Sequence, residues 1–539
     1  MKKFRLRRRS QVASAILAIA MAALVTTAAI ASPDAVAVQA TVAVPAVQGP
    51  IPSTAAPGDP SHNYVFYATT WNLQQAGYVE EEYIVSGTAT RYPNPAGSAN
   101  PMSDAAPIGT MPYTTRIVVR KPADPRKFTG VVLVDWENVT AGHDIDTEWT
   151  SNGDFFMRNG WAEIAATTQR VGVDGGAGLL GGNGLKQWNP VRYGALDLTN
   201  GGTVLDDSQS FDVYSQIGQL AKSESGPFAG YDVQHVYAAG VSQSSRYLSV
   251  YYNTIQHQAG VYDGFVPGLG GLVQRTDLQT KYLRVNTETD VWRGQADPAI
   301  RAQSGLPSIH IWEIAGASHV PQAAISETVG DPRSNLGWLE DRDLGPSTAR
   351  NCRFPYASHV EVWAVFHAAY AALDRWVSDG VAPALPAPIE TNGQTAGFWN
   401  IVRDANGIAL GGIRLPAVQA PVARNDGMNF PSPTSTNPLD AFCILYGTHV
   451  PFSGATLDAL YPNHGAYVSQ FTQAANDAVK QGVLLRPEAQ TLFGDAAHSG
   501  TGKKPEAGTS PAAPTRRRGS FSRRIHRFLP VGSRLRAAK

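Results

Sequence analysis

The chain has 539 residues, of which 43% are hydrophobic and 16% are charged, so it can bury a large core or form two domains of about 100–200 residues each. Its 52 glycines and 37 prolines make it rich in turns, but its aliphatic runs exclude disorder along the whole length. Two cysteines cannot build a zinc ribbon or an iron–sulfur site unaided, so neither is expected.

The net charge of zero hides an uneven distribution. Residues 1–9 hold six basic side chains and residues 516–539 hold nine, with no acid in either segment. The body between them carries 29 basic and 44 acidic residues, an excess of about 15 negative charges. A nucleic-acid-binding core would present a basic face, so no nucleic-acid partner is expected.

The N-terminus has the pattern of an export signal. Its basic residues precede an uncharged, alanine-rich stretch from Ser10 to Ala31, and small residues at Ala29 and Ala31 fit the cleavage rule. The alternative is an uncleaved anchor, because the stretch approaches the roughly 20 residues that span a bilayer. Since alanines and threonines make it only weakly hydrophobic, we favour a signal peptide over residues 1–31 and a secreted, extracellular or envelope-associated protein.

Composition divides the rest of the chain. Residues 32–60 are rich in Pro and Ala and predict a linker, whereas residues 61–499 have a globular composition. Residues 500–539 predict a disordered basic tail, whose scattered apolar side chains would permit weak contact with an anionic membrane or cell wall. Within the globular region we expect accessory or cap segments at about 171–212 and 380–495.

Short apolar runs alternate with helical patterns in the globular region. The strands expected from β-branched and aromatic runs are Thr115–Val119, Gly130–Trp136, Ala162–Thr168, His235–Ala239, Tyr282–Asn286 and Ile309–Ile314. The helices expected from apolar spacing are Phe211–Lys222, Ser244–Gln256 and His359–Val377. Nearly continuous apolar strands that alternate with helices predict an α/β fold with a largely parallel central sheet.

The most informative motif is Gly240-Val241-Ser242-Gln243-Ser244, which joins an expected strand to an expected helix. This arrangement is typical of a nucleophile elbow, in which small residues on both sides of the serine permit a sharp turn. The usual motif ends in glycine, and Ser244 takes that place here. Because a serine can also simply cap a helix, the pentapeptide alone does not decide between the two interpretations.

Downstream residues favour a catalytic triad. In α/β hydrolases the acid and then the histidine follow the serine, each after a strand. Here Glu288 and Asp290 follow the strand that ends at Asn286, and His319 follows the strand that ends at Ile314. We expect Ser242, Asp290 and His319 to form the triad, with Glu288 as the alternative acid. Asp263 is a remote third option.

An oxyanion hole needs two N–H donors. The first is expected from the backbone of Gln243, and the second from Asn138 or Val139, on the loop after the strand that ends at Trp136. The nearby run of His143, Asp144, Asp146 and Glu148 has no familiar metal-ligand spacing. We therefore expect a polar loop that lines the pocket, or solvated acids, and no metal or other cofactor.

Cys352 and Cys443 fall in a protein expected to reach an oxidising compartment. A disulfide is favoured there over two free buried thiols, and it would close a loop of about 90 residues. Neither cysteine lies in a setting that suggests a nucleophile.

Several segments, the elbow among them, resemble the α/β hydrolase domain-containing family. The segments are 134–144, 240–244, 285–291, 312–319, 411–416, 442–448 and 451–452, so the resemblance spans about 60–495. It implies an α/β-hydrolase fold with Ser242, Asp290 or Glu288, and His319 as the triad. It implies no particular substrate.

These features predict an esterase-like serine hydrolase that acts on a small-molecule or lipid-like ester through an acyl-enzyme. One alternative is an acyltransferase that uses the same triad. The other is a non-catalytic binding protein on a hydrolase scaffold, against which the order of the triad residues argues. The sequence does not determine the oligomeric state.

Overall fold

The computed structural model describes residues 41–69, 71–93, 100–176, 184–321, 351–355 and 357–503. The expected signal peptide, the first part of the expected linker and most of the expected basic tail lie outside the described residues. Within these ranges, no helix is both long and apolar enough to cross a membrane.

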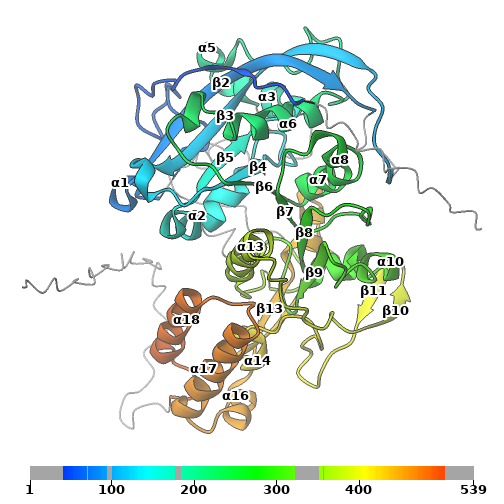
Figure 1. Cartoon of the computed structure of the whole chain (residues 1–539). Coiled ribbons are helices and arrows are strands. Elements are labelled where there is room, and N and C mark those ends of the chain that lie inside the picture. The colour runs from blue at the N-terminus through cyan, green and yellow to red at the C-terminus, as the bar shows by residue number, and fades with distance from the viewer. Residues whose placement is uncertain are drawn as a thin grey trace, which may run out of the picture.

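A nine-stranded sheet forms the centre of the molecule (Figure 1). Its strands stand in the order β1-β2-β3-β5-β4-β6-β7-β8-β9. The pairs from β5 to β9 are parallel, whereas β1, β2 and β3 are antiparallel to their neighbours. Their bounds are β1 (Ala46–Gln48), β2 (Tyr78–Arg91), β3 (Gly109–Pro122), β4 (Val131–Trp136), β5 (Ala162–Ala166), β6 (His235–Val241), β7 (Gly264–Gly268), β8 (Lys281–Thr287) and β9 (Ile309–Ile314).

Among the described elements, helices cover both faces of this sheet. Apolar side chains of α6 (Ser210–Ala221) and α7 (Gln243–Thr254) join the cluster on one face, and those of α2 (Thr147–Asn159) and α13 (Val362–Ser378) join the cluster on the other. The central strands are buried on both sides, which explains their nearly continuous apolar sequence. The mostly parallel α/β architecture predicted from the sequence is therefore confirmed.

Short helices fill the connections. They are α1 (Leu73–Ala76), α3 (Arg170–Asp174), α4 (Leu185–Trp188), α5 (Pro190–Tyr193), α8 (Gln256–Ala259), α9 (Glu288–Asp290) and α10 (Pro298–Arg301). In the described ranges, 3-10 turns lie at Pro125–Lys127, Gly226–Phe228 and Pro438–Phe442, and a π-helical turn lies at Val291–Gln295.

The C-terminal region adds two small sheets and a helical group. Figure 1 shows α16, α17 and α18 at the opposite end of the molecule from β2 and β3. The small sheets pair β10 with β11 and β12 with β13. The elements are β10 (Thr391–Thr395), β11 (Phe398–Ile401), α14 (Pro416–Gln419), β12 (Ala423–Asp426), α15 (Cys443–Tyr446), β13 (Thr448–Pro451), α16 (Gly454–Leu460), α17 (His464–Lys480) and α18 (Arg486–His498).

Two features of the structure bear on the predictions about the linker and the cysteines. The predicted linker 32–60 contains an edge strand, because β1 pairs with β2 from Ala46 opposite Ser86 to Gln48 opposite Ile84. Residues 46–48 of that segment therefore belong to the sheet. Cys352 and Cys443 form the predicted disulfide, with their Cα atoms 5.5 Å apart.

Candidate active site

Ser242 lies on the turn that joins β6 to α7, with backbone angles φ 60° and ψ −115°. A positive φ is costly for a residue with a side chain, and such strain is typical of a nucleophile held at a strand-to-helix turn. The turn is tight because α7 folds back over the strand. A Cβ on Gly240 would lie 2.9 Å from Cβ of Ser244. Small residues are therefore needed at both positions, and serine satisfies the second.

Three side chains from separate loops form a continuous chain of hydrogen bonds. Nδ1 of His319 lies 2.7 Å from Oδ1 of Asp290, and Nε2 lies 2.8 Å from Oγ of Ser242. Because an ionised carboxylate can only accept, Nδ1 of His319 carries the proton that faces Asp290. Nε2 is then free to accept the hydroxyl proton of Ser242. This is the tautomer that a general base requires.

Asp290 is held in place by the residue that begins its own turn. The backbone N–H and the hydroxyl of Thr287 donate to Oδ2 of Asp290 at 2.9 and 2.6 Å, which leaves Oδ1 for His319. Burial by itself raises the pKa of Asp290, but the nearby His319 and these hydrogen bonds outweigh burial and lower the pKa below its usual value. The carboxyl group is therefore ionised at neutral pH.

Glu288, the alternative acid, has different partners. Its side chain is 0% exposed and accepts from the backbone N–H of Gly316 at 2.6 Å and of Gly427 at 3.1 Å. Arg403 donates to it at 2.5 Å. These bonds tie the loop that carries His319 to the C-terminal region. Of the two carboxyl groups left open by the sequence, the structure brings Asp290 to the histidine.

The loop after β4 is anchored beside the serine. The side-chain amide of Asn138 donates to the backbone oxygen of Val241 at 3.0 Å, and its side-chain oxygen accepts from Thr140 N–H at 2.8 Å. Gln243 begins α7, so its N–H has no acceptor within the helix. The structure thus places Asn138 and the adjacent Val139 next to the turn that carries Ser242 and Gln243.

A glutamine that the sequence did not single out also contacts this turn. The side-chain oxygen of Gln169 accepts from Nε2 of Gln243 at 2.9 Å and from Nε1 of Trp136 at 3.0 Å. Gln169 follows β5 and precedes α3. No local motif marks it, because its role depends on the parallel neighbours β4 and β5 ending at the same edge of the sheet.

Asp263, the third acid considered from the sequence, lies elsewhere. It accepts from the backbone N–H of Val236 at 2.8 Å and pairs with Lys222, so it stabilises the start of β6.

The acids after β4 are not solvated. Asp144, Asp146 and Glu148 are at most 2% exposed. The expectation of solvated acids is therefore wrong, because Arg116 and Arg120 extend from β3 into this loop and pair with Asp144 and Asp146. Nothing in the local sequence signals that two arginines from another strand meet these carboxyl groups.

The C-terminal region packs against the loops that carry the acid and the histidine. The hydroxyl of Thr289 donates to the backbone oxygen of Gly427 at 2.6 Å and accepts from His319 N–H at 3.1 Å. A Cβ on Gly427 would lie 2.3 Å from the backbone nitrogen of Thr289, and one on Gly447 would lie 2.7 Å from Cβ of Ser318. This part of the expected accessory segment thus supports the two loops directly.

The model of the α/β hydrolase domain family matches residues 47–494. The chain belongs to this family. The resemblance and the α/β-hydrolase fold expected from the sequence are confirmed, and membership supports a hydrolase. No curated protein matches the chain.

Matches among solved structures are distant. XC6422 from Xanthomonas campestris, an α/β serine hydrolase without a lid, is 12% identical, with a TM-score of 0.25 over 48% of this chain and 94% of that one. Esterase Est22 is 11% identical, with a TM-score of 0.28 over 45% and 74% of the two chains. Esterase B from Lactobacillus rhamnosis is 12% identical, with a TM-score of 0.26 over 55% and 88%.

Proposed function

We propose that the protein is a secreted serine hydrolase that cleaves carboxylic esters through an acyl-enzyme formed on Ser242. The observation that carries the proposal is the unbroken chain of hydrogen bonds from Asp290 through His319 to Ser242. The positive φ of Ser242, at the turn between a strand and a helix, supports the same role.

In the first half of the reaction, Nε2 of His319 takes the hydroxyl proton as Oγ of Ser242 attacks the ester carbonyl carbon. Asp290 orients the ring and stabilises its positive charge. The carbonyl oxygen becomes an oxyanion, which the backbone N–H of Gln243 and that of Asn138 or Val139 would stabilise. The C–O bond to the alcohol then breaks, and the alcohol leaves with the proton from His319.

In the second half, water replaces the alcohol. It gives a proton to Nε2 of His319 and attacks the acyl carbon, and collapse of this intermediate breaks the bond to Oγ. The acid leaves and Ser242 recovers its proton. Residues of the chain itself perform each proton transfer, so these steps use no metal or organic cofactor.

The export part of the proposal rests on two features of the chain. The basic and then alanine-rich N-terminus has the pattern of a signal peptide. The disulfide between Cys352 and Cys443 is of a kind that persists in oxidising compartments. We infer that the mature enzyme acts outside the cytoplasm on small-molecule or lipid-like esters.

A series of p-nitrophenyl esters of increasing acyl length tests the chemistry. Wild-type protein is expected to release p-nitrophenol, and Ser242→Ala is expected to lower kcat/KM at least about 10³-fold, because the nucleophile is lost. Ser245→Ala on the same helix is the matched control, since its hydroxyl donates to Gly270 and not to His319. Wild-type rates in Ser242→Ala would show that another residue is the nucleophile.

A further inference from the structure

A group of carboxyl side chains is buried around the carboxyl end of β4. None of the seven is more than 2% exposed: Glu82, Asp135, Glu137, Asp144, Asp146, Glu148 and Glu163. In the described part of the chain, the guanidinium groups that pair with them are those of Arg116, Arg120 and Arg192. Burying an unpaired carboxylate has a large free-energy cost, so the excess of acid over base requires a further partner.

Three of these carboxyl groups pair with no arginine of the described ranges. Among the residues that the structure describes, no ion pair reaches Asp135, Glu137 or Glu148, and each has one oxygen without a hydrogen-bond partner. A neutral side chain beside them also has an atom without a hydrogen-bond partner among the described residues. Asn152 is 0% exposed and donates its amide to Glu148 at 2.9 Å, while its own side-chain oxygen has no partner. Carboxylate and amide oxygens are the ligands that hard divalent cations prefer.

Part of the group has the spacing of a coordination shell. Asp135 on β4, Asp146 at the start of α2 and Glu163 on β5 each offer one oxygen, and these oxygens lie within 4.8 Å of one another. Because Ca²⁺ binds oxygen at about 2.3–2.6 Å, ligands on opposite sides of the ion are about 5 Å apart. Arg120 pairs with Oδ2 of Asp146 at 2.5 Å and with Oε2 of Glu163 at 3.1 Å. Among the described residues, Oε1 of Glu163 and Oδ2 of Asp135 are left without a partner.

Shared protons do not account for this arrangement. A protonated carboxyl group donates to an acceptor at about 2.5–3.0 Å. Within the part of the chain that the structure describes, Oδ2 of Asp135 and Oε1 of Glu163 have no hydrogen-bond partner. A bound cation would give both oxygens a partner.

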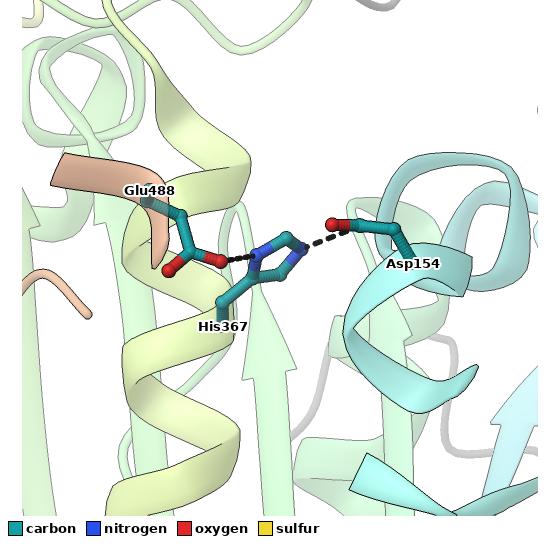
Figure 2. Close-up of side chains that lie close together, drawn as sticks. All are labelled: Asp154, His367 and Glu488. Carbon is teal, nitrogen blue, oxygen red and sulfur yellow. Dashed lines mark hydrogen bonds and ion pairs between the residues drawn. The ribbon is translucent and has the colours of Figure 1, made fainter. Parts of the chain in front are cut away.

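A second cluster, on the outside of α2, lacks this need for a cation. Figure 2 shows His367 of α13 between Glu488 of α18 and Asp154 of α2. Nδ1 of His367 lies 2.7 Å from Glu488, and Nε2 lies 3.5 Å from Asp154. Arg158 pairs with both Asp154 and Glu488. Arg158 thus gives both carboxyl groups of this cluster a positive partner, whereas Asp135 in the buried group pairs with no cation of the described residues. The second cluster is therefore an ion-pair network that joins three helices.

We propose that Asp135, Asp146 and Glu163 bind a divalent cation, with Ca²⁺ as the ion that fits best, and that this ion fixes the loop between β4 and α2. Ca²⁺ fits better than Mg²⁺ because it accepts a shell made wholly of protein oxygens, whereas Mg²⁺ usually keeps several waters. The loop carries Asn138, which is bonded to the strand of the candidate nucleophile. The ion therefore stabilises the fold and takes no part in the ester chemistry.

Metal content and thermal unfolding test the proposal on the full mature protein. After removal of metals with EDTA and dialysis against CaCl2, elemental analysis should find about one equivalent of bound Ca²⁺. Addition of 1 mM CaCl2 should raise Tm by at least about 3 °C, because the ion binds the folded state. Less than about a tenth of an equivalent together with an unchanged Tm would overturn the proposal.

Variants locate the ion. Asp135→Asn and Glu163→Gln should each abolish the Ca²⁺-dependent rise in Tm. Asp154→Asn, on the outer side of α2, is the matched control and should keep it, since its carboxyl belongs to the network of Arg158. If the Ca²⁺-dependent rise in Tm persisted in Asp135→Asn but disappeared in Asp154→Asn, the ion would bind at the outer cluster. That result would overturn the proposal.

Discussion

The two sides of the candidate active site are built in different ways. The serine side is local: β6, the turn at Ser242 and α7 are consecutive, and the close packing of Gly240 on Ser244 spans four residues. The acid and histidine side depends on distant parts of the chain, because Glu288 is bonded to Arg403 and Gly427, more than 100 positions away. A nucleophile turn can therefore be predicted from a local motif, whereas the positions of the acid and the histidine depend on tertiary contacts.

The largest expected effect is a loss of activity on the acid and histidine side, and it distinguishes Asp290 from Glu288. Asp290→Asn should lower kcat by about 10⁴-fold with little change in Tm, because the amide no longer holds His319 in the required tautomer. Steady-state kinetics together with thermal unfolding measures both quantities. An unchanged kcat would show that Asp290 does not orient the histidine.

Glu288→Gln should show the opposite pattern and destabilise the fold by about 3–5 kcal/mol, because Arg403 loses its buried partner. Denaturant unfolding measures the loss. The remaining folded protein should still be labelled by an active-site probe, since Asp290 and His319 keep their bond. If Glu288→Gln instead lost kcat while keeping its stability, the roles of the two acids would be reversed.

A pH effect is expected on the serine side, from the loop after β4. Burial lowers the pKa of His143 from 6.5 to about 4. Between these values the unfolded chain binds more protons than the folded one, so stability falls as the pH drops from 6.5 towards 4. For this residue the loss amounts to about 3 kcal/mol.

His143→Gln, which cannot titrate, should flatten the pH dependence of the unfolding free energy over that range. Chemical denaturation at pH 7 and pH 4.5 measures it. If wild type and His143→Gln lose the same stability on acidification, His143 is not buried in its neutral form.

The smallest expected effect tests the support given by the C-terminal region. Gly427→Ala should lower stability by about 1–3 kcal/mol and reduce kcat, because the added methyl group meets the backbone of Thr289. Gly454→Ala is the matched control, since a Cβ there meets nothing within 4 Å. Equal behaviour of the two variants in unfolding and kinetics would show that the region does not hold the acid and histidine loops.

The same division explains what could be predicted from the sequence. β6, α7 and the position of Ser242 follow from local apolar pattern and small residues. The sequence favoured Asp290 as the acid but kept Glu288 as the alternative, because both follow the same strand and only distant partners such as Arg403 distinguish them. β2 escaped prediction because Glu80, Glu81 and Glu82 interrupt its apolar pattern.

Long-range ion pairs also hide the burial of acidic residues. The side chain of Glu82 is 0% exposed because it pairs with Arg116 on the neighbouring strand and with Arg192 from α5. Charge in a local sequence normally indicates solvent exposure. Here the arginines that reverse this rule lie 34 and 110 positions away, so no local pattern could reveal them.

The most direct test of the central claim is labelling of the purified mature protein with a fluorophosphonate probe, followed by mass spectrometry of the modified peptide. An activated serine should react stoichiometrically, and the adduct should lie on Ser242 and disappear in Ser242→Ala. Absence of labelling in folded wild-type protein, or an adduct on another serine, would contradict the account.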